Sequence, residues 1–283
     1  MIAGRLMLVS LIAAIIVPAA AKSQAISRDE QPAIQQALDR GQLLYAYDQA
    51  AWHGTDAMLA EAKSRGLTDA LPAMIGGWIV RGAANDPIVV FFDKNAGDPK
   101  AVFVVQLSDG GQRVVSSHFV ENGQNAKIDA EARLIIEARN IAVASMADTE
   151  ITRCSPGSFN TVVLPPDPLS GSIIVYLLAP QDKIDEVHFG GHYRVEVSSD
   201  GKAKPAHAFT KACVDMPTSQ APNHPVALIV TQLLDPLPTE ISVFTMLAAQ
   251  LPLYVMTPPD GRTWSVESTG GRAQIRVVPD KQK

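Results

Sequence analysis

Two cysteines, Cys154 and Cys213, constrain the fold of this chain more than any other feature of its sequence. A disulfide requires two Cα atoms within about 7 Å of each other, so a bond between these residues would place two distant segments side by side. A reactive or metal-binding pair is the alternative, but the chain has neither a C-x-x-C spacing nor a clustered third ligand. We therefore expect one structural disulfide.

The first residues have the pattern of an export signal. Arg5 supplies a positive charge, residues 6–17 are almost entirely apolar, and Ala19-Ala20-Ala21 are small residues suited to a cleavage site. The apolar run is shorter than the roughly 20 residues that a helix needs to span a bilayer. We expect cleavage after Ala21 or after Ala25, and a soluble periplasmic or secreted protein without a stable membrane anchor, in an oxidising compartment where a disulfide persists.

Composition and motifs argue against several classes of function. The formal net charge of −5 is mild, and no basic run is interleaved with aromatic residues, so nucleic acid is not an expected partner. The chain also lacks a G-x-S-x-G elbow, a P-loop and a G-x-G-x-x-G dinucleotide motif. We expect no cofactor and no catalytic machinery of these familiar kinds.

The first half of the chain has the periodicity of a long helical region followed by strands. Residues 29–65 place apolar side chains mostly three to four residues apart, and Pro32 suits a first helical turn. We expect Gly41 and Gly54 to divide this region into two or three shorter helices. The region also gathers aromatic and polar residues, namely Tyr45, Tyr47, Asp48, Trp52 and His53. They either line a ligand cleft or form an aromatic helix face that packs on a sheet while the polar ends of the side chains contact solvent. We favour the second interpretation.

Four β-rich runs follow the helical region, at residues 75–80, 88–93, 101–107 and 112–121. The polar turns between them are short, which predicts an antiparallel meander. Helical periodicity then returns at residues 129–146, where Asp129 and Glu131 suit the positive end of a helix.

The second half also reads as strands. Residues 159–164 and 172–179 are predicted strands, and the run from Ile173 to Leu178 is apolar on both faces, as in a central strand covered from both sides. Residues 192–197 instead alternate between polar and apolar side chains. This alternation predicts a strand with one buried face.

The polar row of that strand, His192, Arg194 and Glu196, is the candidate ligand-binding constellation. Residues two apart on one strand face lie about 7 Å from each other, close enough to converge on one small polar group or anion. The alternative is a solvated strand face with an Arg–Glu pair worth at most about 1 kcal/mol.

His188 and His192 have the H-x3-H spacing found in zinc sites. On an extended strand these two positions would lie roughly 13 Å apart, and Gly190-Gly191 opposes a helix. A bulge at the two glycines is the alternative that would bring the histidines together. We therefore expect no metal site at these histidines.

Residues 227–264 contain a strand, a loop that opens an apolar helix, and two further strands around an Asp-Gly turn. This order resembles the JAB/MPN metallopeptidase-like fold, in which a strand ends in H-x-H-P and a loop carries S-x-x-D at a helix start. In that family the two histidines and the aspartate hold zinc, and a glutamate on an earlier strand handles the proton. Here Gln232 and Leu234 stand at the histidine positions, and Thr239 and Ser242 are the nearest match to S-x-x-D. The resemblance implies a degenerate, non-catalytic version without zinc ligands, and an unrelated strand–helix–strand unit is the alternative.

Together these patterns predict an α+β fold of mainly antiparallel sheets with flanking helices. We expect a signal peptide at residues 1–21 and two packed units, a helix–meander–helix unit at 22–150 and a disulfide-containing α+β unit at 151–283. The expected function is that of an exported, non-catalytic binding or interaction protein for an envelope protein or a small polar ligand. The alternative is a periplasmic hydrolase that uses His192 and Glu196, with Arg194 stabilising an anion.

Overall fold

The computed structural model describes residues 25–121, 126–219, 225–258 and 261–279, so the predicted signal peptide lies outside the described residues. The α-helices in these ranges are α1 (Gln31–Ser64), α2 (Leu71–Met74), α3 (Ala130–Ser145) and α4 (Glu240–Ala249). The strands are β1 (Gly77–Ala83), β2 (Asp86–Phe92), β3 (Ala101–Ser108), β4 (Arg113–Phe119), β5 (Asn160–Val163), β6 (Ile173–Leu178), β7 (Glu186–His188), β8 (Tyr193–Val197), β9 (His207–Ala208), β10 (Asp215–Pro217), β11 (Leu228–Thr231), β12 (Leu253–Thr257), β13 (Arg262–Thr269) and β14 (Arg272–Val277). The predicted α+β class is confirmed, and the strand pairing is mostly antiparallel. Within the described ranges, no helix combines the length and the apolar character needed to cross a membrane.

The predicted meander is confirmed by the sheet of β1 to β4. Its strands lie in the order β1-β2-β3-β4 and all pairs are antiparallel. The following helix, α3, begins as expected at Asp129, whose carboxylate accepts a hydrogen bond of 2.9 Å from the Ala132 N–H. An acidic cap of this kind satisfies a backbone donor that the first helical turn leaves unpaired.

The predicted division of the first helical region is wrong, because α1 runs without a break through both glycines. Each glycine instead allows a close approach by another element. A Cβ atom on Gly41 would lie 2.5 Å from the Cβ atom of Val243 in α4, and one on Gly54 would lie 3.1 Å from a methyl group of Val89 in β2. The helix tolerates the lower propensity of glycine here because α4 and the meander pack directly on its backbone.

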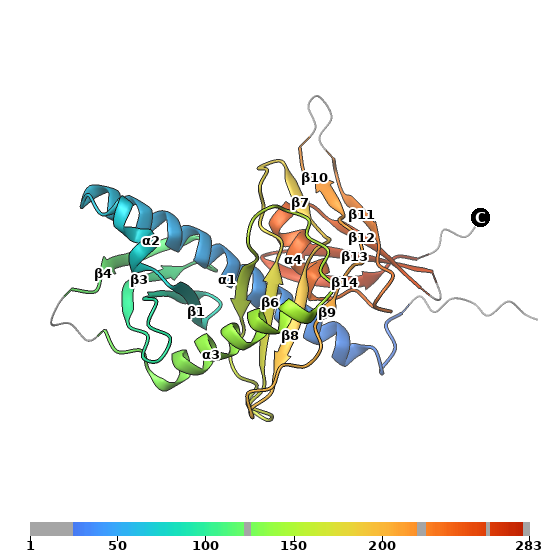
Figure 1. Ribbon diagram of the computed structural model, residues 1–283. Helices are drawn as coiled ribbons and strands as arrows, with labels where there is room; N and C mark the ends of the chain where they lie inside the picture. Colours follow the sequence, from blue (N-terminus) through green and yellow to red (C-terminus); the bar gives the residue numbers. More distant parts are fainter. Residues whose placement is uncertain (1–24, 122–125, 220–224, 259–260, 280–283) are drawn as a thin grey trace, which may run out of the picture.

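A second sheet, of order β5-β6-β8-β9, forms the centre of the molecule and is covered on both faces (Figure 1). Val175 and Leu177 of β6 share a hydrophobic cluster with Ile135 of α3, whereas Tyr176 and Leu178 belong to the cluster that contains Leu44 of α1. The prediction of a central, doubly covered strand is therefore confirmed. On β8 the apolar residues face α3, as the alternation predicts.

A third sheet, of order β11-β12-β13-β14, contains the segment that resembles the JAB/MPN fold. β11 and β12 are parallel and α4 connects them, while the other pairs are antiparallel. Gln232, at a position where that family has a histidine, donates hydrogen bonds to the carbonyl groups of Asp235 and Leu237 and accepts one from Ser242 Oγ. In this chain it holds the loop before α4, and the family resemblance stays a prediction.

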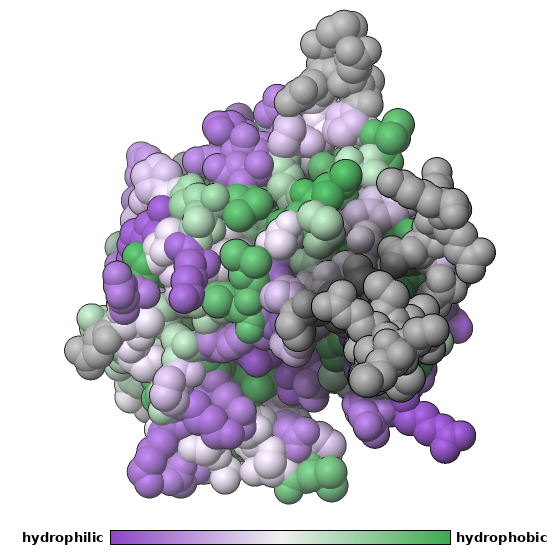
Figure 2. Space-filling model, turned by 90° about the vertical axis from the view of Figure 1, so that its right-hand side faces the viewer, coloured by the Kyte–Doolittle hydropathy of each residue, from purple (hydrophilic) through white to green (hydrophobic). Residues whose placement is uncertain are grey.

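The side of the molecule that is occupied by this third sheet has a mixed surface. Figure 2 shows apolar groups there in small clusters between polar ones. Exposed apolar side chains of this part of the chain include Val226, Ile229, Leu233 and Met256. Scattered apolar residues of this kind are normal on a protein surface.

Helix α1 links the two units that the sequence predicts. Figure 1 shows it running along the molecule from the β11–β14 sheet to the β1–β4 sheet. One hydrophobic cluster accordingly extends from Ile34 in α1 to Phe103 in the meander and Ile275 in β14. Helix α3, from the first predicted unit, packs on the central sheet of the second. The boundary near residue 150 stays a prediction, while the packing joins both parts through shared helices.

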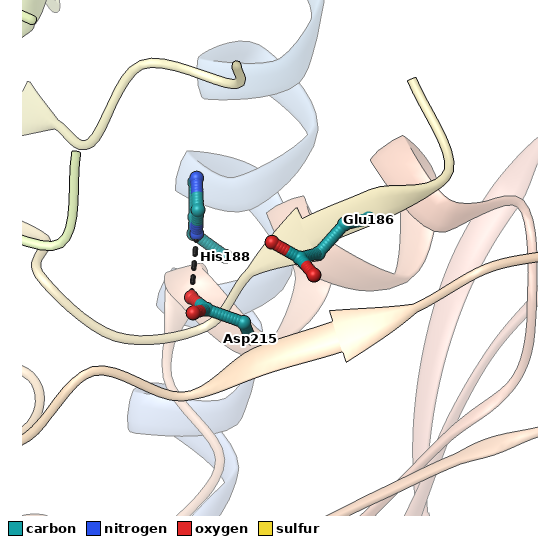
Figure 3. Close-up of side chains that lie close together, drawn as sticks. All are labelled: Glu186, His188 and Asp215. Carbon is teal, nitrogen blue, oxygen red and sulfur yellow. Dashed lines mark hydrogen bonds and ion pairs between the residues drawn. The ribbon is translucent and has the colours of Figure 1, made fainter. Parts of the chain in front are cut away.

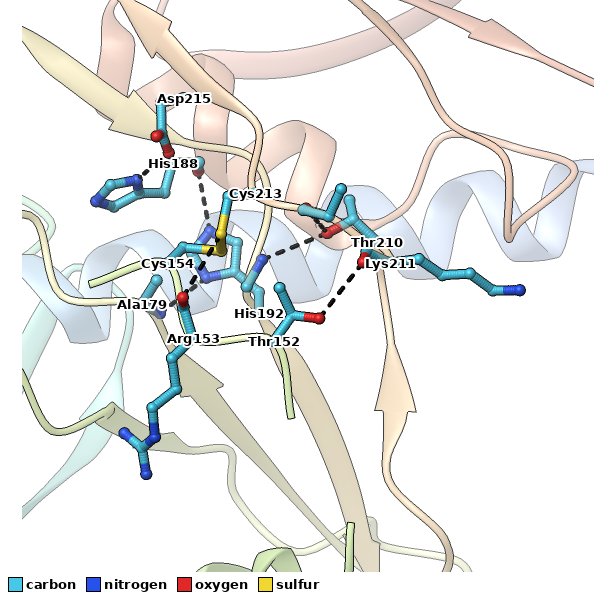
Figure 4. The surroundings of a disulfide bond; sticks show 12 residues. Thr152, Arg153, Cys154, Ala179, His188, His192, Thr210, Lys211, Cys213 and Asp215 are labelled. Carbon is cyan, nitrogen blue, oxygen red and sulfur yellow. Dashed lines mark hydrogen bonds and ion pairs between the residues drawn. A yellow bond between two sulfur atoms is a disulfide. The ribbon is translucent and has the colours of Figure 1, made fainter. Parts of the chain in front are cut away.

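The predicted disulfide between Cys154 and Cys213 is confirmed (Figure 4). Their Cα atoms lie 5.3 Å apart, within the range that such a bond requires. The chain passes beside the bond at Gly190 and Gly191. A Cβ atom on Gly191 would lie 2.6 Å from Cys154 Sγ, and one on Gly190 would lie 2.4 Å from the Ala212 carbonyl oxygen. Glycine is required at both positions because no side chain fits between these segments.

Candidate ligand-binding cavity

A cavity of about 710 Å³ lies where the sheets and helices of the two halves meet. Helices α1 and α4, strands β1, β5, β6 and β7, and the loop after β6 all contribute to its wall. Its apolar lining includes Val162, Leu178, Val187 and Phe244. A cavity of this size suits a small molecule, and an apolar wall with a few polar groups is typical of such sites.

One wall is a stripe of side chains on α1. Tyr45, Asp48 and Trp52 line the cavity, because residues three or four apart share one face of a helix. His53 also lines it and stacks on Trp52 with ring centroids 5.2 Å apart. Four residues of the aromatic and polar cluster on α1 therefore line a cavity, as the ligand-cleft interpretation predicts. Tyr47 fits the favoured packing interpretation instead, since it is fully buried and donates a hydrogen bond of 2.6 Å to the Gly82 carbonyl oxygen.

The carboxyl group of Asp48 has an unusual environment. Burial in this wall raises its pKa to about 6, although a hydrogen bond with the Gln49 side chain acts in the opposite direction. Burial has this effect because it disfavours the charged form of a carboxyl group. A strongly shifted carboxyl in a cavity is a characteristic of functional sites.

The opposite wall contains His188, held by an aspartate from a strand distant in sequence. β7 and β10 pair in antiparallel register, with His188 opposite Asp215, and His188 Nδ1 lies 2.7 Å from Asp215 Oδ1 (Figure 3). In the tautomer whose Nδ1 donates to this carboxylate, Nε2 is a hydrogen-bond acceptor. Nε2 is buried without a hydrogen-bond partner, 3.7 Å from Asp182 Oδ1.

Sequence reasoning missed the pairing of His188 with Asp215. Asp215 stands 27 residues after the histidine, and β10, the strand that contains it, covers only Asp215–Pro217. The nearby Cys213 is the one signal in the sequence that pointed to this juxtaposition, because its disulfide draws the second segment toward the first.

Glu186, His188 and Asp215 also form a group whose possible ligand atoms all lie within 4.8 Å of one another (Figure 3). The carboxylate of Glu186 already accepts a hydrogen bond of 2.9 Å from Lys183 Nζ, which places a positive charge beside the group. The expectation that the chain binds no metal stays a prediction.

The predicted wide separation of His188 and His192 along an extended strand is wrong. His188 and His192 are not joined by an extended strand, since β8 begins at Tyr193 and the chain bends at Gly190 and Gly191. His192 Nε2 consequently lies 2.9 Å from the His188 carbonyl oxygen. The two rings nevertheless have separate partners, Asp215 for His188 and backbone groups for His192.

The structure brings His192, Arg194 and Glu196 onto the face of the central sheet that α1 and α4 cover, but gives each a different partner. His192 is 2% exposed; its Nδ1 accepts a hydrogen bond from the Ala179 N–H and its Nε2 donates to the His188 carbonyl. Burial lowers its pKa to about 4. Arg194 pairs with Glu240 at 2.6 Å, and Glu196 pairs with Lys204 at 2.8 Å. Of the three, His192 alone lines the large cavity, and their role as a shared ligand site stays a prediction.

Three buried polar atoms in the cavity wall have no hydrogen-bond partner among the described residues. They are Trp78 Nε1, His188 Nε2 and Thr245 Oγ1. Most buried polar groups in folded proteins are paired, because an unpaired one costs about 1–3 kcal/mol. Because all three belong to residues that line one cavity, the cavity is the candidate ligand site.

This interpretation predicts an unusual response to replacing Thr245 by Val. The variant removes an unpaired buried hydroxyl and keeps the side-chain shape, so we expect the ligand-free protein to be unchanged or about 1 kcal/mol more stable in urea unfolding. The control is Thr257→Val, since Thr257 Oγ1 accepts a hydrogen bond of 2.9 Å from Trp264 Nε1. The control should lose about 1–3 kcal/mol, as the buried indole N–H is left unpaired. Equal losses in both variants would show that the Thr245 hydroxyl has a partner in the ligand-free protein.

No family model matches this chain, and comparisons with curated proteins and with solved structures likewise yield no match.

Proposed function

We propose that the protein is an exported, soluble binding protein that holds a small amphipathic molecule in the cavity between α1, α4 and β7. The observation that carries the proposal is the set of unpartnered polar atoms of Trp78, His188 and Thr245 in the cavity wall. Export is supported by the apolar leader at residues 6–17, and a disulfide is compatible with it.

The three atoms specify what the bound molecule must offer. Trp78 Nε1 is a donor and needs an acceptor, whereas His188 Nε2 needs a donor. The Thr245 hydroxyl can do either. The apolar side chains between them, among them Leu178 and Phe244, suit the hydrocarbon part of the ligand. The ligand is therefore amphipathic, with at least one donor and one acceptor.

The alternative hydrolase that uses His192 has less support. A general base needs a ring nitrogen that is free to take a proton from the substrate or from water. Both ring nitrogens of His192 are hydrogen-bonded to the backbone, and burial lowers the pKa of this ring to about 4. The neutral ring is suited to fixing the end of β6 at Ala179 and the turn before β8.

Native mass spectrometry on protein recovered from the envelope fraction tests the binding role. We expect a bound small molecule on the wild-type protein, and at least about tenfold less of it on Ala248→Trp, whose indole would occupy the cavity. Leu59→Trp is the matched control, because Leu59 is 45% exposed on α1 and lies outside the cavity wall. The denatured mass of the same sample shows whether the chain begins at Lys22 or Ile26, as export predicts.

Equal ligand occupancy in Ala248→Trp and the wild type would contradict the assignment of the cavity. A folded wild-type protein that has no bound molecule and gains none from an envelope extract would contradict the binding role itself. An intact Met1 on protein taken from the envelope would contradict cleavage of the leader.

A further inference from the structure

We propose that the ligand of this cavity is a small organic cation, an apolar molecule with an ammonium group held by the carboxylates and aromatic rings of the wall. This inference rests on the proposed binding function and adds the chemical class of the ligand. Four features of the wall carry it: its charge, the position of His188 beside Asp182, its aromatic rings, and the environment of Asp48.

The charge that faces the cavity favours a cation. Asp48 enters the wall from α1 and Asp182 from the loop after β6. Lys183 is the one lysine or arginine in the described lining, and its ammonium group is paired with Glu186 at 2.9 Å. Lys183 also interacts electrostatically with Asp182, whereas no lysine or arginine of the described residues acts on Asp48. The lining thus has two aspartates and one lysine already paired with Glu186, so an anionic ligand would meet repulsion.

His188 and Asp182 provide the geometry for an ammonium group. In the tautomer whose Nδ1 donates to Asp215, Nε2 is an acceptor, and Asp182 Oδ1 is a second acceptor 3.7 Å away. Two acceptors at this separation can each take a hydrogen from one ammonium group at ordinary hydrogen-bond length. A donor with three hydrogens thus satisfies the buried Nε2 and the carboxylate together.

Aromatic rings complete this recognition. Tyr45, Trp52 and Trp78 all line the cavity. Indole and phenol rings attract a cation over their faces, with tryptophan the strongest. Trp52 uses one face to stack on His53 and keeps an exposed fraction of 59%, so its ring remains accessible to a ligand. Aromatic rings beside carboxylates are a combination that binds organic cations in preference to neutral molecules of the same shape.

The environment of Asp48 agrees with this assignment. Burial raises the pKa of its carboxyl group to about 6, so the ionised form at neutral pH lacks the stabilisation it has in water. The same negative charge contributes to a raised pKa of Tyr45, after the larger effect of burial, so both residues share one region of the wall. A bound cation would stabilise the ionised form of Asp48, and a neutral ligand would not.

Calorimetric titration with three probes of matched shape tests the ligand class. The probes are 2-phenylethylammonium, neutral 2-phenylethanol and phenylacetate, each added to the mature protein near neutral pH. We expect the ammonium probe to bind at least about tenfold more tightly than the alcohol, because a hydrogen bond to a charged group is stronger than one between neutral groups. We expect phenylacetate to bind most weakly.

Variants assign the effect to the two aspartates. Asp48→Asn and Asp182→Asn should each weaken binding of the ammonium probe several-fold and leave the affinity for the alcohol unchanged. Asp56→Asn is the control, because it removes the same negative charge from an exposed position of α1 that lies outside the cavity wall. Circular dichroism of each variant confirms that it is folded.

The outcomes separate this inference from the binding role on which it rests. If the alcohol or phenylacetate binds as tightly as the ammonium probe, the ligand class is wrong and the binding role stands. The same conclusion follows if Asp48→Asn and Asp182→Asn bind the ammonium probe as the wild type does. If no probe binds, the ligand class is again wrong, and the mass-spectrometric comparison of Ala248→Trp with Leu59→Trp decides the binding role separately.

Discussion

Reduction of the disulfide between Cys154 and Cys213 should lower the free energy of unfolding by about 4 kcal/mol in the chain-entropy model. The bond closes a loop with a sequence separation of 59 residues, and its loss frees that loop in the unfolded chain. Because an ordinary domain has a net stability of about 5–15 kcal/mol, the unfolding midpoint in urea should fall markedly on adding a reductant. The double variant Cys154→Ala with Cys213→Ala should show the same fall without any reductant.

The double variant is also the control for the reductant, since its unfolding midpoint should not change when the reductant is added. Thiol titration of the unfolded, unreduced wild-type protein is an independent measurement. Two free thiols there, or a reduced protein as stable as the oxidised one, would contradict the prediction. The reduced protein should also bind the ammonium probe more weakly, because Cys213 lies just before Asp215, which holds His188.

Replacing Glu240 by Ala should destabilise the protein by about 3–5 kcal/mol, because it leaves a partly buried cation and a buried hydroxyl without their partner. Glu240 is 4% exposed in the first turn of α4. Its Oε1 accepts hydrogen bonds of 2.8 Å from Tyr176 Oη and 2.6 Å from Arg194 Nη1. These contacts join α4 to the two central strands, β6 and β8. The loss is measurable as the change in unfolding free energy in urea.

The matched control is Glu196→Ala on the same strand as Arg194. The ion pair of Glu196 with Lys204 is partly exposed, with the side chains 33% and 58% exposed, so its loss should cost at most about 1 kcal/mol. If Glu240→Ala does not fold, Glu240→Gln keeps a hydrogen-bond acceptor and should lie between the control and the wild type. Equal stabilities of the Glu240→Ala and Glu196→Ala proteins would refute the assigned role of Glu240.

Local patterns predicted the elements of this fold well because the signals that define them lie within a few residues. The turns between the meander strands, the acidic cap at Asp129 and the unbroken apolar run of β6 each give the correct structure. The glycines of α1 misled the prediction for a related reason. Glycine weakens an isolated helix, but Gly41 is compensated by the close packing of Val243, which is about 200 residues away in the chain.

The candidate site was predictable only in part. The aromatic and acidic stripe on α1 is visible in the sequence, because residues three to four apart share a helix face whatever lies opposite. Whether that face packs on a sheet or lines a cavity depends on which other helices and strands pack against α1. Likewise, Arg194 and Glu196 share one face of β8 and His192 directly precedes the strand, but the partners that engage them come from other elements, α4 in the case of Arg194.

Sequence alone thus determined the α+β class, the order of most elements and the disulfide between Cys154 and Cys213, since alternation, turn chemistry and the presence of only two cysteines are local or countable properties. Tertiary structure decided that α1 is continuous, that His188 is paired with Asp215, and that Trp78, His188 and Thr245, each with a buried unpartnered atom, line one cavity. The physical reason is that burial and hydrogen-bond satisfaction depend on which distant segments meet, and no local periodicity encodes that meeting.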